Sequence, residues 1–212
     1  MSGCDVWHST QVPPMTVLFV CTANICRSPY AAAAFNSAAQ QAGLDARALS
    51  AGVRVDLLEV SGQPTCDEMP YDEPRPKGSI IERPSAHGAT QLTVEAVREA
   101  DLIAVFEPSH RSHVIQLHPR AQLTTYTIRQ LARFATAISE IDWPGAAPAP
   151  TGDVLRDLNL ARSWAPFSTD DAVPDPHGHG VDAHRASADV VDQCVVALIR
   201  AMQIRHADFV SQ

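Results

Sequence analysis

The sequence predicts an α/β domain with three layers, in which a four-stranded parallel sheet carries helices on both faces. Short apolar runs rich in β-branched residues alternate along the chain with longer segments of helical periodicity. This alternation is typical of parallel sheets, because their strands are buried on both faces and are joined by crossover helices. The chain has 212 residues, of which 45% are hydrophobic, and this is enough for one domain with an elaboration.

The first half of the chain begins with a strand–loop–helix pattern. Thr16 to Cys21 is a short apolar run that predicts a buried strand. From Ser28 onward the sequence is alanine-rich, with Pro29 in the first turn and Gly43 just past the end, and these signals predict a helix. Ala46 to Ser50 predicts a second strand.

A long excursion separates this unit from the next alternation of strands and helices. Residues 53–91 are proline-rich and poorly periodic, and they predict a surface excursion with room for one helix. Beyond them we predict helices at Thr93–Ala100, Pro108–Leu117 and Thr127–Ile141, and strands at Asp101–Phe106 and Ala121–Thr124. Apolar residues at helical spacing predict a last helix from about Asp182 to His206.

The chain is expected to form one domain. Residues 1–14 carry no periodicity and end in two prolines, so we expect a tail there and a single domain at 15–212. A Pro/Ala/Gly-rich insertion is expected at about 142–174, with a short amphipathic helix inside it. There is no internal repeat.

Composition and charge exclude several classes of protein. The formal net charge of −8 argues against a general nucleic-acid binder, which needs a broad basic face. No apolar run approaches the roughly 20 residues needed to span a bilayer, and the N-terminus MSGCDVWHST lacks the features of a secretory signal. Five unevenly spaced cysteines without such a signal predict reduced thiols in a cytoplasmic protein.

The stretch VLFVCTANICRSPY, residues 17–30, places a cysteine at the end of a predicted strand and an arginine six positions later. Ligands of parallel sheets bind beyond the carboxyl ends of the strands. There the loop up to Arg27 can turn its backbone N–H groups toward an anion, and a helix N-terminus adds its positive dipole. The same field favours a thiolate at Cys21, and Arg27 offers a charged fork that matches two phosphate oxygens. Cysteine is common in buried strands, so the prediction depends on this whole context.

The sequence CTANICRSP resembles the phosphate loop of the low-molecular-weight protein tyrosine phosphatases, Cys-x5-Arg-Ser/Thr. Further family landmarks follow in the same order: Ser50-Ala51-Gly52, Gly62-Gln63-Pro64, HGATQL at 87–92, EADL at 99–102 and Val173-Pro174-Asp175-Pro176. Together they span roughly residues 16 to 206. The longer form of the chain, with TIRQLARF and the insertion, is similar to actinobacterial members. The family fold that this implies is the three-layer fold predicted above.

The resemblance implies a role for each residue of the loop. Cys21 would attack phosphorus and form a cysteinyl-phosphate intermediate, while Arg27 and the loop amides would hold the equatorial oxygens. Ser28 would donate a hydrogen bond to the thiolate, and Asn24 would hold the shape of the loop. The expected phosphate-binding residues are Thr22, Ala23, Asn24, Ile25, Cys26, Arg27 and Ser28.

The general acid implied by the resemblance is Asp175. It would protonate the leaving group and then activate the incoming water. Asp170, Asp171 and Asp182 are close in sequence, and composition alone does not choose among these carboxylates. Only the proline after Asp175 and the family pattern favour it.

These roles imply a phosphatase that hydrolyses phosphate monoesters, with protein phosphotyrosine as the favoured substrate. Its partners would be a phosphorylated protein or a small aryl phosphate, with inorganic phosphate as product, and neither nucleic acid nor a membrane. Arsenate reductases of the same fold are an alternative. The thioredoxin-coupled type needs a close pair of cysteines after the third strand, and the sequence has no such pair there. A reductase that is coupled to a small thiol needs no pair and stays open. A phosphate-binding regulatory protein without turnover is a second alternative, although binding alone would not require Asp175.

The chain departs from the family pattern at several positions. Ala23 occupies a usual glycine position, and a positive φ there would strain alanine. Thr90 replaces an arginine, so one polar contact that supports the loop is expected to be lost. His177 replaces an aromatic residue, so the aromatic walls for phosphotyrosine are expected to be thinner. Trp143 and Trp164 are candidates for those walls, although anchoring of the insertion is the simpler role.

No metal site and no cofactor are expected. His177, His179 and His184 with Asp182 match no familiar zinc spacing. Cys4, Cys66 and Cys194 are interpreted as bystanders, with Cys194 in a helix core. Cys26 is different, because curling of the loop would bring it near Cys21, where it could capture an oxidised nucleophile as a reversible disulfide.

Overall fold

The computed structural model describes residues 14–56, 66, 69–75, 80–83, 87–139, 151–163, 165 and 168–209, with the backbone alone beyond residue 203. Four parallel strands form one sheet in the order β2-β1-β3-β4. They are β1 (Met15–Cys21), β2 (Ala46–Gly52), β3 (Leu102–Val105) and β4 (Thr125–Thr127). The predicted four-stranded parallel sheet is therefore confirmed.

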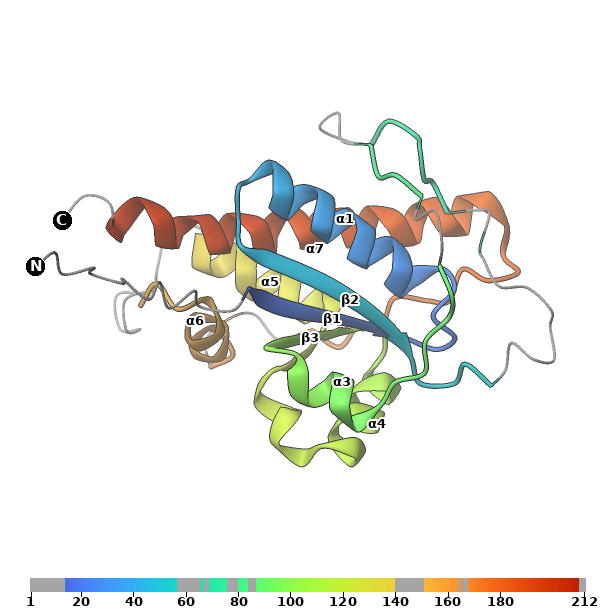
Figure 1. The fold of residues 1–212 in the computed structure, drawn as a ribbon, viewed down its shortest axis with the longest axis horizontal. Coiled ribbons are helices and arrows are strands. Elements are labelled where there is room, and N and C mark those ends of the chain that lie inside the picture. Colours follow the sequence, from blue (N-terminus) through green and yellow to red (C-terminus); the bar gives the residue numbers. More distant parts are fainter. Residues whose placement is uncertain are drawn as a thin grey trace, which may run out of the picture.

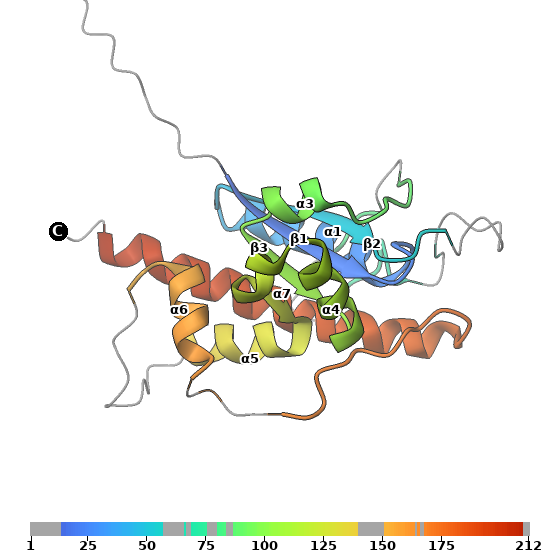
Figure 2. The ribbon, with the colours of Figure 1, turned by 90° about the horizontal axis from the view of Figure 1, so that it is seen from below.

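Helices cover both faces of the sheet, so the three predicted layers are present (Figures 1 and 2). One face carries α1 (Arg27–Gln41), α5 (Ile128–Ser139) and α7 (Gly180–Phe209). The other carries α3 (Val94–Glu99) and α4 (Pro108–Leu117). A further helix, α6 (Val154–Ala161), packs on α5. No helix in the described part of the chain is long and apolar enough to cross a membrane.

The burial of β1 shows why this strand is the centre of the fold. Val17 and Phe19 belong to the hydrophobic cluster under α1, α5 and α7, whereas Leu18 and Val20 belong to the cluster under α3 and α4. Alternate side chains of a strand point to opposite faces, so a continuous apolar run fits a strand buried on both sides. The strand pairs with β2 on one edge and β3 on the other, and this places Cys21 where the strand order reverses, the usual ligand site of such sheets.

Local signals in the sequence explain the bounds of several helices. The alanine-rich α1 buries Tyr30 and Phe35 completely and is followed by Gly43 at a φ of +65°, which glycine adopts without strain. Thr93 accepts a hydrogen bond from Ala96 N–H at the start of α3, and Asp153 does the same for the first turn of α6.

The predicted strand at Ala121–Thr124 is wrong. Residues Pro119–Leu123 form a 3-10 helix, and β4 follows it at Thr125–Thr127. Pro119 begins the turn, and the Thr125 hydroxyl donates a hydrogen bond back to the Ala121 carbonyl at 2.7 Å. Leu123 is 61% exposed, whereas all three residues of β4 are buried. The buried residues of the edge strand begin at Thr125, directly after the end of the predicted strand.

Other expectations hold in part or cannot be followed. In the excursion, the described residues contain an isolated bridge between Pro74 and Ile80 and no helix. The last helix begins at Gly180 and ends at Phe209, so it is longer than predicted. The predicted tail, apart from residue 14, lies outside the described residues, as do residues 142–150, 164, 166 and 167 of the insertion.

Candidate active site

Cys21 lies at the carboxyl end of β1, and the loop of residues 22–26 turns from there into α1. The side chain is 3% exposed. The helix begins at Arg27, so its first N–H groups and the positive end of its dipole face the same loop. The structure therefore brings together the cysteine, the loop and the helix N-terminus that the sequence predicts.

Gly52, at the end of β2, lets a second segment approach the loop. A Cβ atom at this position would lie 2.7 Å from the Thr22 carbonyl oxygen and 2.8 Å from the Asn24 nitrogen. The next two N–H groups, from Val53 and Arg54, donate to the carbonyls of Cys21 and Thr22 at 3.0 and 2.8 Å. The loop is thus held by backbone contacts that only glycine permits at residue 52.

Asn24 carries the unusual backbone conformation of the loop. Its φ is +57°, and Asn24 and Asp72 are the only non-glycine residues with positive φ in the described ranges. Asparagine tolerates this conformation better than most residues. The condition for strain at Ala23 is therefore not met, because the positive φ falls on the next residue.

The side chain of Asn24 ties the loop to its surroundings. It is fully buried; its Nδ2 donates to Ser28 Oγ at 2.9 Å, and its Oδ1 accepts from the Thr90 N–H at 2.8 Å. Its carbonyl lies 2.7 Å from His87 Nε2. Thr90 thus supports the loop through its backbone N–H, and this contact offsets the expected loss of a side-chain contact at this position.

Ser28 links this scaffold to Cys21. Its Oγ lies 3.0 Å from Cys21 Sγ and 3.3 Å from the Ala51 carbonyl oxygen. Asn24 already donates to this oxygen, so the single hydroxyl proton goes either to the Ala51 carbonyl oxygen or to the Cys21 sulfur. A thiolate at Cys21 would receive this hydrogen bond.

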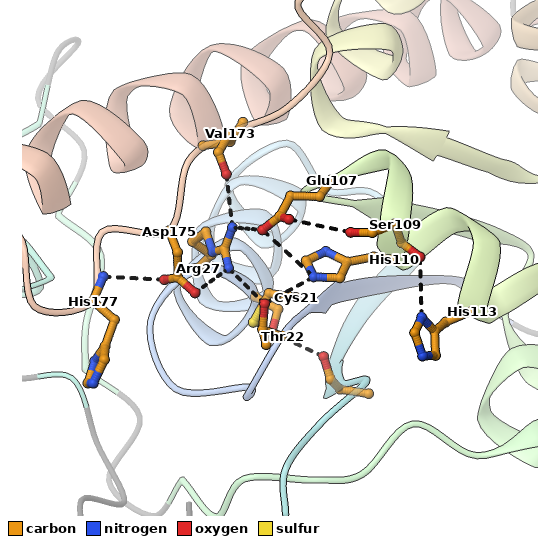
Figure 3. Close-up of polar contacts among 12 residues, drawn as sticks. Cys21, Thr22, Arg27, Glu107, Ser109, His110, His113, Val173, Asp175 and His177 are labelled. Atoms are coloured by element: carbon orange, nitrogen blue, oxygen red, sulfur yellow. Dashed lines mark hydrogen bonds and ion pairs between the residues drawn. The ribbon is translucent and has the colours of Figure 1, made fainter. Parts of the chain in front are cut away.

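Arg27 is 1% exposed and is surrounded by hydrogen-bond acceptors (Figure 3). Nη1 donates to Glu107 Oε1 at 2.8 Å and to the Val173 carbonyl at 2.9 Å. Nη2 donates to Thr22 Oγ1 at 3.1 Å and to Asp175 Oδ2 at 2.6 Å. Its guanidinium also lies over the Phe106 ring, 5.6 Å from the centroid. Glu107 and the Val173 carbonyl therefore hold the Nη1 side of the guanidinium, whereas Asp175 contacts its Nη2 side.

Asp175 reaches the site on a segment that precedes α7, called here the acid loop (residues 171–177). Val173 anchors this loop, since its N–H donates to the Phe106 carbonyl at 2.8 Å while its carbonyl accepts from Arg27. Asp175 itself is 45% exposed, and it points toward Arg27 in Figure 3. His177, exposed in the same loop, points away from Arg27.

The neighbouring aspartates lie elsewhere. Asp171 accepts a hydrogen bond from Gln130 at 2.6 Å and pairs with Arg133 at 2.7 Å, so it attaches the acid loop to α5. Asp170 is exposed, and Asp182 is exposed in the first turn of α7. Of these four carboxylates, Asp175 is the one that contacts Arg27.

Glu107 and His110 join the site although the sequence analysis did not select them. Burial alone would raise the pKa of Glu107, but the hydrogen bond from Arg27 and the nearby His110 and Arg27 charges outweigh burial, and the pKa is lowered. His110 Nε2 lies 3.0 Å from Thr22 Oγ1, and burial lowers the pKa of His110 to about 4. Their position after β3 was an available signal, because that strand ends beside β1.

Cys26 and Cys66 are neighbours, and the interpretation of Cys66 as a bystander stays a prediction. Both are buried, and hydrogen bonding with Cys66, followed by burial, raises the pKa of the Cys26 thiol far above its ordinary value. Cys194 is fully buried in α7, as expected. Cys4 lies outside the described residues, and the proposed pairing of Cys26 with Cys21 stays a prediction.

The surroundings of the site contain little aromatic surface. Every aromatic side chain that the structure describes is buried: Phe19, Tyr30, Phe35, Tyr71, Phe106, Tyr126 and Phe134. Trp143 and Trp164, the candidates for substrate walls, lie outside the described residues. A cavity of about 480 Å³ adjoins Asp175 and is lined mainly by apolar atoms, among them Pro174, Pro176 and Val190.

Comparisons with known proteins agree on one family. A family model described as low molecular weight phosphotyrosine protein phosphatase matches residues 16–154. The chain is 30% identical over 118 residues to a protein-arginine-phosphatase of Bacillus subtilis, covering 55% of this chain and 71% of the relative. It is 30% identical over 122 residues to a probable low molecular weight protein-tyrosine-phosphatase, EpsP, of Ralstonia nicotianae, covering 58% and 76%. The crystal structure of the tyrosine phosphatase AmsI of Erwinia amylovora superposes with a TM-score of 0.58 at 20% identity over 91% of this chain and 95% of that one.

Proposed function

The chain belongs to the low molecular weight phosphotyrosine protein phosphatase family, and from this premise we propose that Cys21, Arg27 and Asp175 carry out the hydrolysis of phosphate from proteins. The observation that carries the proposal is their arrangement. Cys21 Sγ lies 3.0 Å from Ser28 Oγ, and Arg27 at the other end of the same loop contacts Asp175 at 2.6 Å. This arrangement supports the proposal, because the three side chains lie in one region of the molecule (Figure 3).

In the first step the Cys21 thiolate would attack phosphorus while the bond from phosphorus to the leaving oxygen breaks. The loop amides and Arg27 would hold the equatorial oxygens, where charge is spread in the transition state. Asp175 would give its proton to the leaving oxygen, so that an alcohol or phenol departs. The product of this step is a cysteinyl phosphate.

In the second step water would attack the cysteinyl phosphate and the sulfur–phosphorus bond would break. Asp175, now a carboxylate, would accept a proton from the water, and Cys21 would leave as a thiolate that receives the hydrogen bond from Ser28. Inorganic phosphate is released and the enzyme returns to its starting protonation state. No electron transfer is needed.

The contacts of Arg27 fit an exchange of partners during this cycle. Glu107 and the Val173 carbonyl hold Nη1, which fixes the plane of the fork. A bound phosphate would take over the Nη2 donors, and this would release the half-exposed Asp175 toward the leaving group. Glu107 is therefore proposed to be a positioning residue for Arg27.

Phosphotyrosine in proteins is the substrate that we propose first. The family description and the EpsP relative name phosphotyrosine or tyrosine phosphatases. Phosphoarginine is a second candidate, because the B. subtilis relative is named a protein-arginine-phosphatase and all described aromatic side chains are buried. A guanidinium leaving group would also suit Asp175, which is 45% exposed.

The alternatives from the sequence predict different behaviour. An arsenate reductase coupled to a small thiol would consume reductant, and a regulatory phosphate-binding protein would bind without turnover. The acid beside Arg27 supports turnover, since binding alone does not need a proton donor. We also propose that the protein works in the reducing cytoplasm, where thiols such as Cys21, Cys26 and Cys194 persist.

The test is a side-by-side steady-state assay of the full chain with a tyrosine-phosphorylated peptide, an arginine-phosphorylated peptide, a small aryl phosphate, and arsenate with reduced thiol. We expect phosphate release from the first peptide at the highest kcat/KM, and none from Cys21→Ser. Preference for the arginine peptide by more than tenfold, about 1.4 kcal/mol in barrier, would shift the assignment to the second candidate. Thiol consumption with arsenate and no phosphate release would contradict hydrolysis.

A further inference from the structure

Cys26, Cys66 and His184 form a buried cluster that the proposed reaction does not use. Two Sγ atoms and one imidazole nitrogen lie within 4.8 Å of one another. The three side chains are 4%, 7% and 0% exposed. They come from the start of α1, from the excursion and from the N-terminal part of α7, so the tertiary fold gathers them.

The orientation of His184 identifies the nitrogen that faces a ligand. Its Nδ1 lies 2.8 Å from the Gly180 carbonyl oxygen. A carbonyl only accepts, so Nδ1 carries a proton, and Nε2 is the ring nitrogen that can bind a metal ion. A ring N–H that donates to a backbone carbonyl is the usual support for a metal-binding histidine, because it fixes both the tautomer and the ring plane.

The donor set selects the class of ion. Thiolate sulfur and imidazole nitrogen are preferred by thiophilic cations such as Zn²⁺, and hard cations such as Mg²⁺ prefer oxygen. Zn–S and Zn–N bonds of about 2.3 and 2.0 Å place tetrahedral ligand atoms roughly 3.5–4 Å apart. A spread of at most 4.8 Å therefore needs a contraction of only about 1 Å.

We propose that Cys26, Cys66 and His184 bind one Zn²⁺ ion, with water in the fourth position. Binding would replace the two thiol protons, which go to solvent, by two sulfur–zinc bonds. Two thiolates and one Zn²⁺ have a net charge of zero, so the buried site would carry no uncompensated charge. The ion would therefore add no net charge beside the phosphate loop. This inference is independent of the hydrolytic mechanism.

The bound ion would have two consequences for the neighbouring loop. It would join the excursion and α7 to the residue directly before Arg27, and so stabilise the loop against local opening. It would also engage the Cys26 sulfur, which then cannot capture an oxidised Cys21. Zinc and the predicted Cys21–Cys26 disulfide are therefore mutually exclusive.

The experiment uses the full chain with Cys21→Ser, which removes the reactive thiol from the measurement. The protein is stripped with a chelator under a phosphine reductant and dialysed against buffered Zn²⁺, and bound metal per chain is measured by mass spectrometry. Substitution by Co²⁺ reports the ligands through thiolate-to-cobalt charge-transfer absorption. We expect one ion per chain, a charge-transfer band, and a higher unfolding temperature when the ion is bound.

Two further variants and one matched control locate the ion. Cys66→Ser and His184→Gln should each weaken Zn²⁺ binding by at least about 100-fold, since even the loss of a supporting contact costs 10- to 100-fold. Cys194→Ser removes another buried cysteine, ten residues beyond His184 on the same helix, and should bind Zn²⁺ as before. If His184→Gln fails to fold, Cys66→Ser and the Co²⁺ spectrum still decide.

Three results would overturn the proposal. The Cys21→Ser protein could bind no stoichiometric Zn²⁺ and show no charge-transfer band, so that the cluster is only a set of thiol–imidazole hydrogen bonds. Zn²⁺ binding could survive Cys66→Ser unchanged, which places the ion elsewhere. Mild peroxide could form a Cys26–Cys66 disulfide in protein that binds no metal, which makes the pair a redox element.

Discussion

The two loops that form the candidate active site are held in different ways. In the phosphate loop, residues 21–28, Asn24 and Ser28 are fully buried and Arg27 is 1% exposed. Backbone hydrogen bonds from the segment after Gly52 hold two of its carbonyls. The acid loop, residues 171–177, is attached at Val173 and Asp171, whereas Asp175 is 45% exposed and held mainly by Arg27.

This difference matches the tasks that we propose for the two loops, anion binding for the phosphate loop and proton transfer for the acid loop. Charge develops on the phosphoryl oxygens, and donors fixed in advance stabilise it without reorganisation. In the proposed mechanism Asp175 would meet leaving groups of different size and exchange a proton twice, so it would need a position that can change. A buried scaffold for the anion and an exposed, ion-paired acid meet both needs.

The largest effect is expected for a substitution that removes the proposed nucleophile and leaves the rest of the phosphate loop unchanged. Cys21→Ser should lower kcat by at least about 10⁴-fold, close to 5.5 kcal/mol in barrier, because the hydroxyl is a far weaker nucleophile. Affinity for phosphate or vanadate should stay within about threefold, since the loop amides and Arg27 remain. Residual activity within tenfold of wild type would contradict the proposed nucleophile, and loss of vanadate affinity would show that the loop is not preformed.

The second prediction tests the acid loop. Asp175→Asn should slow aryl phosphates with poor leaving groups by about 10²–10³-fold and activated ones much less, because only poor leaving groups need protonation. Asp170→Asn, an exposed carboxylate five residues earlier, is the matched control and should change neither. An equal loss for both substrate types would indicate a structural role for Asp175.

The third prediction concerns Gly52, which lets the segment after β2 approach the phosphate loop. Gly52→Ala would place a Cβ 2.7 Å from the Thr22 carbonyl and 2.8 Å from the Asn24 nitrogen. Both are backbone atoms, so the loop must shift, at a cost of about 1–3 kcal/mol in the free energy of unfolding and at least about tenfold in kcat/KM. Gly88→Ala is the control, because no heavy atom lies within 4 Å of its added Cβ. Similar urea midpoints for both variants would contradict this role of Gly52.

The sequence predicts the phosphate loop well because its parts are contiguous. A buried strand, a turn and a helix start follow one another between Thr16 and Ser28, so local rules place Cys21 and Arg27 together. The edge strand was misplaced because β4 is only three residues long, and Thr125–Thr127 carry fewer apolar residues than the 3-10 turn before them. Short edge elements give weak periodic signals.

Contacts between distant segments could not be predicted in the same way. Asp175 was selected only through its proline and the family pattern, while the structure shows its contact with Arg27. The cluster of Cys26, Cys66 and His184 has ligand spacings of 40 and 118 residues, and no local motif contains them. Only the packing of α7 against α1 and of the excursion beside them places these side chains together.

The smallest expected effect concerns His110, which touches the phosphate loop from α4. Burial lowers the pKa of His110 to about 4, against about 6.5 in an unfolded chain. Between pH 6.5 and 4 the unfolded state therefore binds more protons, and the free energy of unfolding must fall as the pH falls. This pKa already includes the opposing attraction of the nearby Glu107 carboxylate for the protonated ring, so we expect a loss of no more than about 3 kcal/mol over this range.

Urea unfolding of the wild type and of His110→Gln at several pH values between 4 and 7 measures how much of the free energy of unfolding is lost through His110. Glutamine can keep a hydrogen bond to Thr22, 3.0 Å from the histidine nitrogen, but it does not titrate. The variant should therefore lose less stability than the wild type as the pH falls, because the contribution of His110 is absent. His113→Gln, an exposed histidine on the same helix, should follow the wild type. Parallel curves for wild type and His110→Gln would show that burial of His110 does not make the scaffold of the phosphate loop sensitive to acid.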